Sequence, residues 1–189
     1  MREAGEGMGL LTLEPLVDAV RDGVEHTGWT LSGLQKTTST EFEGRWKGES
    51  TRSAYLFFHR EDLPEAVTVE GFLDETGQGL RGTLALVVDG PEMGAAGDLP
   101  ALLARVARAA GDTLPEGYRL PLSLRIGMPD ARGVVREGEI QIRFKLRFPS
   151  TAFEAGSSAI AALSSAAAGA FERLLERPEV AELLPPVVD

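Results

Sequence analysis

Residues 140–148 read IQIRFKLRF, a stretch in which apolar and polar side chains alternate. A period of two is typical of a β-strand with one face on the core and the other in solvent. The apolar face holds Ile140, Ile142, Phe144, Leu146 and Phe148. The opposite face holds Arg143, Lys145 and Arg147, which we call the basic stripe. This segment therefore predicts both a strand of the core sheet and a charged outer surface.

The segments just before this strand extend the pattern. Residues 120–128, LPLSLRIGM, show the same alternation, and turn-forming residues at 129–133 join the two strands into a hairpin. Before the hairpin, Asp98 can cap an apolar helix that Gly111 ends.

A long helix follows the hairpin. It begins at Ser150 or Thr151 and ends before Pro178. Its middle, residues 155–170, consists largely of Ala, Ser and Gly. Small side chains let another backbone approach closely, and that backbone belongs either to the sheet of the same chain or to a second copy of the helix.

The N-terminal half begins with an amphipathic helix and continues with strands. The helix carries Leu13, Leu16, Val17, Val20 and Val24, and Gly28 ends it. Strands are predicted at 41–47, 54–58, 67–73 and 80–88, so residues 30–88 hold three or four strands. In 54–58, AYLFF, both faces are apolar, which predicts a central strand covered on two sides.

In chain order these elements give α-β-β-β(-β)-α-β-β-α. Such an order predicts an α+β fold in which an antiparallel meander sheet has its helices on one face. The length of 189 residues suits a single domain over 1–189, with loose ends at 1–9 and 179–189.

Composition excludes several classes of function. The formal net charge of −10 repels a phosphate backbone, so direct binding of nucleic acid is not expected. The chain has no cysteine, which excludes disulfides and thiolate chemistry. It contains neither a long apolar run nor a signal-peptide core, so we expect a cytoplasmic protein that does not enter a membrane.

Residues suited to catalysis or to metal binding are scarce. The two histidines, His26 and His59, stand at the ends of a helix and a strand, where caps and surface histidines are common. No nucleophile motif, metal-ligand spacing or calcium loop accompanies them. We therefore expect no enzyme, no cofactor and no metal.

The layout, size and acidity of the chain resemble those of the YbjN family, which is in turn similar to type III secretion chaperones. The step Gly28-Trp29 out of the first helix and the aromatic strand Tyr55-Leu56-Phe57-Phe58 fit that resemblance. It implies a small bacterial protein, often a homodimer without catalytic residues, that holds a partner protein or an extended segment of it. A bacterial stress or DNA-damage response is one setting for such an adaptor, with a stress-response or DNA-repair protein as partner. The tract of small residues would place Ala162 and Ala166 in the dimer interface.

Two surfaces are candidates for the partner site. The first is the basic stripe, which Arg119 and Arg125 extend if they share its face. Residues 119–147 carry seven Lys and Arg against three acidic residues, so this is a basic region of an acidic chain. The alternative interpretation of the stripe is an ordinary solvated face of a sheet, because charged strand faces are common. The second surface is the aromatic strand, through Tyr55 and Phe57.

An alternative function is a small-molecule-binding or enzymatic α+β domain. Its pocket would be lined by Trp29, Trp46, Tyr55 and Phe57. An enclosed pocket at these residues would favour that alternative, whereas an open aromatic groove would favour a protein partner.

Overall fold

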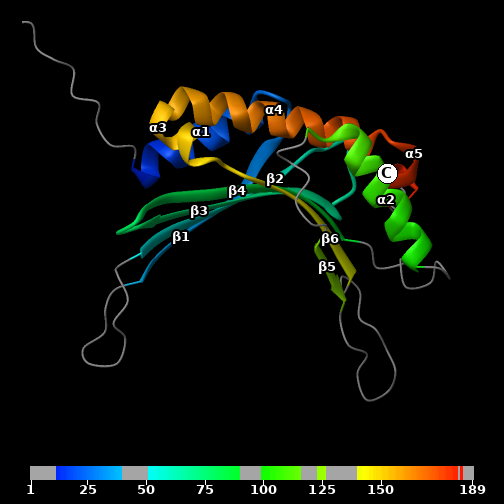
Figure 1. Ribbon diagram of the computed structural model, residues 1–189. Helices are drawn as coiled ribbons and strands as arrows, with labels where there is room; N and C mark the ends of the chain where they lie inside the picture. The colour runs from blue at the N-terminus through cyan, green and yellow to red at the C-terminus, as the bar shows by residue number, and fades with distance from the viewer. Residues whose placement is uncertain are drawn as a thin grey trace, which may run out of the picture.

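The computed structural model describes residues 12–39, 51–89, 99–115, 123–126, 140–182 and 184 (Figure 1). Its helices are α1 (Leu13–Glu25), α2 (Leu99–Thr113), α3 (Ser150–Ala155), α4 (Ser157–Leu175) and α5 (Pro178–Ala181). Its strands are β1 (Thr30–Ser39), β2 (Thr51–His59), β3 (Val67–Thr76), β4 (Gly79–Asp89), β5 (Ser123–Ile126) and β6 (Ile140–Arg147).

The strands form one antiparallel sheet in the order β1-β2-β3-β4-β6-β5. Residues 30–88 therefore contain four strands, joined as a meander. The chain then passes through α2 before β5 and β6, and it is β6 that pairs with β4. All described helices lie on one side of the sheet, and the sheet arches so that its other side is concave (Figure 1). The predicted α+β class, with a meander and helices on one face, is confirmed.

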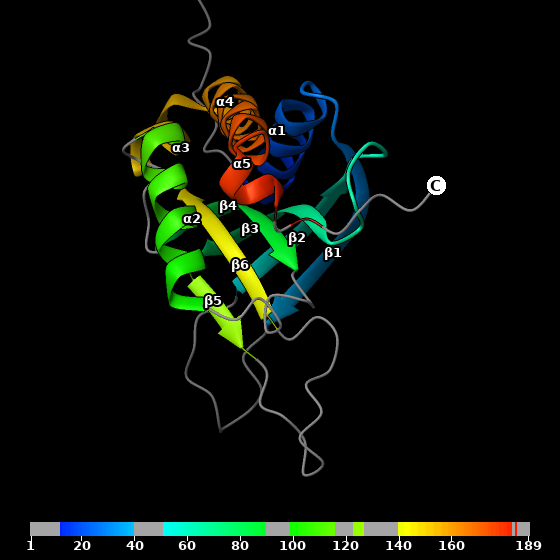
Figure 2. The ribbon, with the colours of Figure 1, turned by 90° about the vertical axis from the view of Figure 1, so that its right-hand side faces the viewer.

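The core lies between the sheet and the helix layer. Alternate residues of the strands point toward the helices and are buried, among them Leu56, Phe58, Leu84, Leu86, Ile142 and Phe144. From the other side, α1 contributes its apolar stripe and α4 contributes Ile160, Phe171 and Leu174, all fully buried. The two helices run side by side above the sheet, and α2 stands beside β6 and β5 (Figure 2).

The tract of small residues on α4 packs against α1. A Cβ atom added at Gly23 of α1 would lie 2.3 Å from the backbone oxygen of Ala161 and 2.8 Å from the Cβ of Ser164. The two helix backbones thus meet at a distance that only glycine permits. The close approach predicted from the tract exists within the chain, although its partner is a helix and not the sheet.

Two predictions about helices are wrong. The single long helix after 150 is two helices, α3 and α4, because Gly156 between them has a φ of 95°, which is incompatible with a helix. Helix α2 passes through Gly111 and continues to Thr113, since a glycine weakens a helix without having to end it. The prediction that the last long helix ends before Pro178 is confirmed, because α4 stops at Leu175. Pro178 then starts α5, with proline at the first helical position, where its missing N–H costs nothing.

One further prediction needs correction, and four lie beyond the described residues. The segment 179–189 was expected to be loose, yet residues 178–181 are helical and Val180 is fully buried. The strand predicted at 41–47, the cap Asp98, the turn at 129–133 and the loose end at 1–9 lie outside the described residues.

Candidate functional site

Strand β2 presents its aromatic side chains to both faces of the sheet. Leu56 and Phe58 are fully buried beneath the helices, whereas Tyr55 is 37% exposed and Phe57 36% exposed on the concave face. The prediction that this strand is covered on two sides is therefore wrong, because no described helix covers the second side. Phe72 of β3 lies directly opposite Tyr55, with ring centroids 5.0 Å apart. We call Tyr55, Phe57 and Phe72 the aromatic patch.

Strand β6 places the basic stripe on the same concave face. Ile142, Phe144, Leu146 and Phe148 of its apolar row are buried, as predicted. On the opposite face, Arg143 and Lys145 are half-buried and Arg147 is exposed. Paired residues of neighbouring strands share a face, so the register can be followed across the sheet. One row runs Phe57, Glu70, Ala85, Lys145, and the next runs Tyr55, Phe72, Thr83, Arg147. The two candidate surfaces are thus opposite sides of one site.

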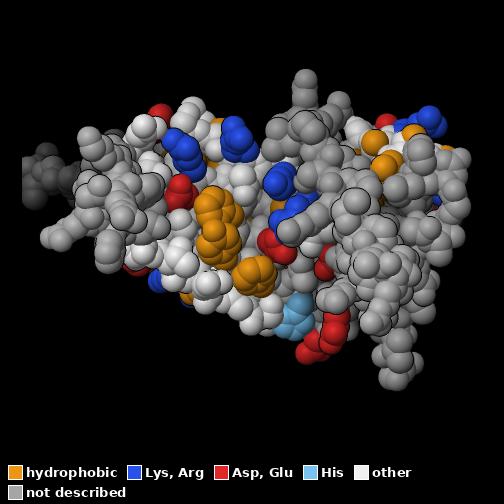
Figure 3. Space-filling model, turned by 90° about the horizontal axis from the view of Figure 1, so that it is seen from below, with side chains coloured by type: hydrophobic (Ala, Val, Ile, Leu, Met, Phe, Trp, Pro, Cys, Tyr) orange, Lys and Arg blue, Asp and Glu red, His pale blue; other side chains and the backbone are white. Residues whose placement is uncertain are grey.

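Between the aromatic patch and the basic stripe lies an open groove of about 510 Å³. Its lining comprises Tyr55, Phe57, Glu70, Gly71, Phe72, Thr83, Ala85, Arg143 and Lys145. The space-filling view shows hydrophobic side chains gathered near the middle of this face, with Lys and Arg side chains beside them (Figure 3). Because Thr83 and Ala85 of β4 are small, the middle of the groove is lower than its two walls.

The charges in the groove are only partly balanced. Arg143 pairs with Glu70 across the groove, with Nη1 2.7 Å from Oε2, and its Nε donates to Gln141 at 2.6 Å. Gln141 in turn donates to Asp89 at 2.8 Å. Within the described part of the chain, neither Lys145 nor Arg147 has an ion-pair partner. Among the described residues, the groove therefore offers one uncommitted cation in its lining, Lys145, and a second in the next row, Arg147, opposite an aromatic wall.

Most of the remaining predicted site residues do not line the groove. Arg119 and Trp46 are outside the described residues. Arg125 of β5 pairs with Gln141 of β6 and so holds a register position on the same face of the sheet as the basic stripe. Trp29 is 1% exposed and belongs to the core on the helix side. The alternative pocket is therefore not assembled, since Trp29 and the pair Tyr55 and Phe57 lie on opposite sides of the sheet.

Five residues of the groove were missed by sequence reasoning. They enter the groove through strand register, and they are Glu70, Gly71 and Phe72 of β3 and Thr83 and Ala85 of β4. The alternation in β3 was visible, with Glu70 and Phe72 opposite the apolar row, but nothing local indicated which residues of β2 and β6 they would meet. Pairing between β4 and β6 is a long-range property of the fold.

The predicted dimer residues and the two histidines are exposed. Ala162 and Ala166 lie one turn apart on α4 and are open to solvent. His26 follows the last residue of α1, and its backbone N–H donates to the carbonyl oxygen of Asp22. His59 ends β2 and is paired with Thr30 of the edge strand. Neither histidine lines the groove.

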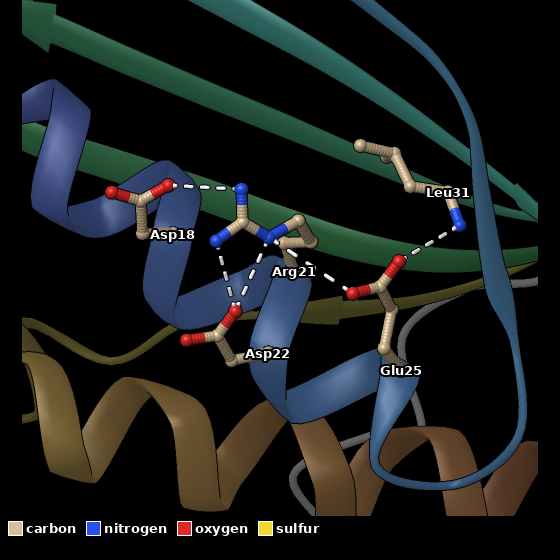
Figure 4. A network of polar contacts seen from close by, with 5 residues as sticks. All are labelled: Asp18, Arg21, Asp22, Glu25 and Leu31. Atoms are coloured by element: carbon tan, nitrogen blue, oxygen red, sulfur yellow. Dashed lines mark hydrogen bonds and ion pairs between the residues drawn. The ribbon is translucent and has the colours of Figure 1, made fainter.

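A second polar cluster surrounds Arg21 on α1 (Figure 4). Its guanidinium lies 3.1 Å from Asp22, 3.3 Å from Asp18 and 4.0 Å from Glu25. The hydrogen bond that Arg21 donates to Asp22 raises the pKa of Arg21 above its ordinary value. Glu25 also accepts the backbone N–H of Leu31 at 3.2 Å, which ties α1 to β1. The cluster is satisfied by these contacts, and among the described residues no group of acidic or histidine side chains is arranged to hold a metal ion.

Comparison with family models, with curated proteins and with solved structures finds no match to this chain. None of the helices in the described ranges is both long and apolar enough to cross a membrane.

Proposed function

We propose that this protein is a non-enzymatic binding protein, chaperone-like or an adaptor, which holds an extended segment of a partner protein in the groove. The observation that carries the proposal is the aromatic patch on the concave face. Leu34, Tyr55 and Phe57 are the large hydrophobic residues that stand exposed in the described chain, and two of the three line the groove. Exposed aromatic side chains gathered at a concave surface are typical of protein-binding sites.

The shape of the groove favours a polypeptide over a small molecule. A small-molecule pocket encloses most of its ligand, whereas this groove is only partly enclosed. Its floor follows strand β4, so an extended chain lying over Thr83 and Ala85 would contact both walls at once. The resemblance to the YbjN family and to type III secretion chaperones is in accord with this proposal. A cytoplasmic homodimer acting in a bacterial stress or DNA-damage response belongs to the same proposal.

The test uses an unfolded client and two matched variants. We expect fluorescence anisotropy to detect binding of labelled, reduced and carboxymethylated lactalbumin to the wild-type protein. Replacing Tyr55 and Phe57 together with Thr, which suits an exposed strand, should weaken that binding by about tenfold or more. The control is Leu34→Thr, because Leu34 is also exposed but pairs with the buried Leu56 and so points away from the groove.

The control variant should bind the client as the wild type does. Circular dichroism must show that both variants are folded. Equal binding by the double variant and the wild type would rule out the groove as the client site.

A further inference from the structure

We infer that the groove selects an acidic partner segment in which acidic and apolar residues alternate along an extended chain. This inference rests on the proposed function and adds the chemical pattern of the segment that is held. It is carried by the matching two-residue spacing of the two groove walls and by the two unpaired cations on one of them.

The two walls have the same repeat. Tyr55 and Phe57 are two residues apart on β2, and Lys145 and Arg147 are two residues apart on β6. Residues two apart in a strand are separated by about 6.6–6.8 Å. The register aligns the walls, because Phe57 and Lys145 share one row while Tyr55 and Arg147 share the next.

An extended peptide laid along β4 has this same repeat and sends successive side chains in opposite directions. One set of its side chains would therefore face the aromatic patch and the other set would face Lys145 and Arg147. Thr83 and Ala85 leave room for its backbone between the walls. The pattern that satisfies both walls is apolar residues alternating with carboxylates.

The charges at the groove determine which charge the second set of peptide side chains, the one facing Lys145 and Arg147, should carry. Glu70, which is in the same row as Lys145, is engaged by Arg143 at 2.7 Å. Two other carboxylates of this face are also occupied, since Asp74 accepts a hydrogen bond from Ser53 at 2.8 Å and Asp89 accepts one from Gln141. In the part of the chain that the structure describes, Lys145 and Arg147 thus remain without an ion-pair partner, although the net charge of the chain is −10. Charges on a protein surface favour a partner of opposite charge and disfavour a partner of the same charge. A partner with carboxylates at these positions is therefore favoured.

Cations beside aromatic rings can also bind single-stranded nucleic acid. Among the described residues, the free cations at the groove are Lys145 in its lining and Arg147 in the next row, and they share this face with the carboxylate of Glu70. The protein as a whole repels phosphates through its net charge. A short acidic peptide needs fewer cations than a phosphate backbone, which carries a charge at every nucleotide. The observations therefore favour the peptide.

The experiment measures the binding of labelled, acetylated octapeptides by fluorescence anisotropy. The first alternates Glu and Leu, and the second has the same composition arranged as a Glu block followed by a Leu block. A third alternates Ser and Leu, and a fourth alternates Lys and Leu. We expect the alternating acidic peptide to bind at least about tenfold more tightly than each of the others.

Two charge-reversed proteins locate the contact. The variant K145E/R147E should lose about tenfold or more of its affinity for the alternating acidic peptide. The matched control is K36E/R173E, which makes the same change in net charge at exposed residues outside the groove, on β1 and α4. The control should bind as the wild type does. The affinity ratio between wild type and K145E/R147E should also fall as salt is added, because salt screens the local attraction.

Each other outcome overturns the inference. Equal binding of the alternating and block peptides would exclude recognition of the pattern, and unchanged binding by K145E/R147E would exclude the cations. If the Ser and Leu peptide bound equally well and lost affinity in the Tyr55 and Phe57 double variant, the proposed function would stand without selection for acids. If a thymidine oligonucleotide bound more tightly than the alternating acidic peptide, the ligand of the groove would be a nucleic acid and not a peptide. Binding of no peptide would overturn the inference, while the lactalbumin assay would still decide the proposed function.

Discussion

Arg60 is the side chain that joins the end of β2 to the helix layer. Its Nη1 lies 2.7 Å from Oε1 of Glu172 on α4, and its guanidinium lies 5.8 Å from the centre of the Trp29 ring. A second contact reaches Asp62, and this hydrogen bond raises the pKa of Arg60 above its ordinary value. One cation thereby fixes a helix, a strand end and a core tryptophan. Contacts of this kind are worth about 0.5–1 kcal/mol each at partly exposed sites.

The pair between Arg60 and Asp62 makes stability depend on pH in the acid range. The hydrogen bond from Arg60 lowers the pKa of Asp62 below its ordinary value of 3.8. A carboxylate with a lowered pKa in the folded state stabilises the protein fully above the unfolded-state value and loses that contribution as the pH falls through the folded-state value. Asp62→Asn should therefore be less stable than wild type near neutrality, by up to about 1 kcal/mol because the side chain is 63% exposed.

Urea unfolding of both proteins between about pH 7 and about pH 2 checks this expectation. The difference in their free energies of unfolding should shrink once the pH drops below 3.8. A difference that stays constant over the whole range would mean that the charge of Asp62 contributes nothing.

At the scale of elements, the contact between α1 and α4 decides how the helix layer fits the sheet. Gly23 faces the backbone of Ala161, so the two helices cannot separate or rotate without losing the buried stripe of α1. Glycine lowers helix propensity by about 1 kcal/mol relative to alanine. The contact that it permits offsets this cost through closer packing of the two helices.

Two glycine substitutions separate packing from propensity. Gly23→Ala should destabilise the protein by about 1–3 kcal/mol, because the new Cβ would meet a backbone oxygen that cannot move aside. Gly111→Ala in α2 is the matched control, since nothing lies within 4 Å of its added Cβ. It should stabilise the protein by up to about 1 kcal/mol. Thermal or urea unfolding measures both, and a stabilised Gly23→Ala variant would contradict the contact.

The periodicity of apolar residues predicted the elements that bury one face. It failed for elements that have no regular row of buried apolar residues. The apolar rows of α1 and β6 repeat regularly, and both elements were predicted correctly. Strand β1 was not predicted at its observed position, Thr30–Ser39. The sequence of this exposed edge strand, TLSGLQKTTS, has no regular apolar row. The break at Gly156 was missed because a glycine inside a run of small residues does not reveal the sign of its φ.

The site was predicted in its parts and not as a whole. The basic stripe and the aromatic strand were each found from a two-residue period in the sequence, since each lies within one strand. The aromatic row of β2 was interpreted as core, because an apolar side chain in a sequence looks the same whether it is buried or exposed for binding. The two surfaces come together through the pairing of β4 with β6. This pairing joins residues that are far apart in the sequence, such as Thr83 and Arg147.

At the scale of the whole molecule, the two sides of the sheet have different roles. One side carries the core and the helices, and the other carries the groove. The outer surface of α4, with Ala162 and Ala166 exposed on it, faces away from the groove's side of the sheet (Figure 1). A dimer formed through α4 would therefore leave the groove of each copy accessible.

The homodimer stays a prediction, and light scattering at micromolar concentration tests it. We expect a mass twice that of the 20.2 kDa chain. Ala162→Leu and Ala166→Leu should each weaken association, by about 1–3 kcal/mol through overpacking of the interface. Dimers that tolerate both changes would have their interface elsewhere, and a mass of 20.2 kDa would exclude the dimer.

The helix layer is assembled from the two ends of the chain, and this has a consequence during synthesis on the ribosome. Strand β4 ends at Asp89, whereas α4 begins only at Ser157, so at about 5–20 residues per second the ribosome needs roughly 3–14 s to make the residues between them. During that interval α1 and then α2 are complete, whereas α4, which packs beside α1, is not. The part of the sheet that α4 covers in the finished protein therefore stays open until the C-terminal end of the chain has been made.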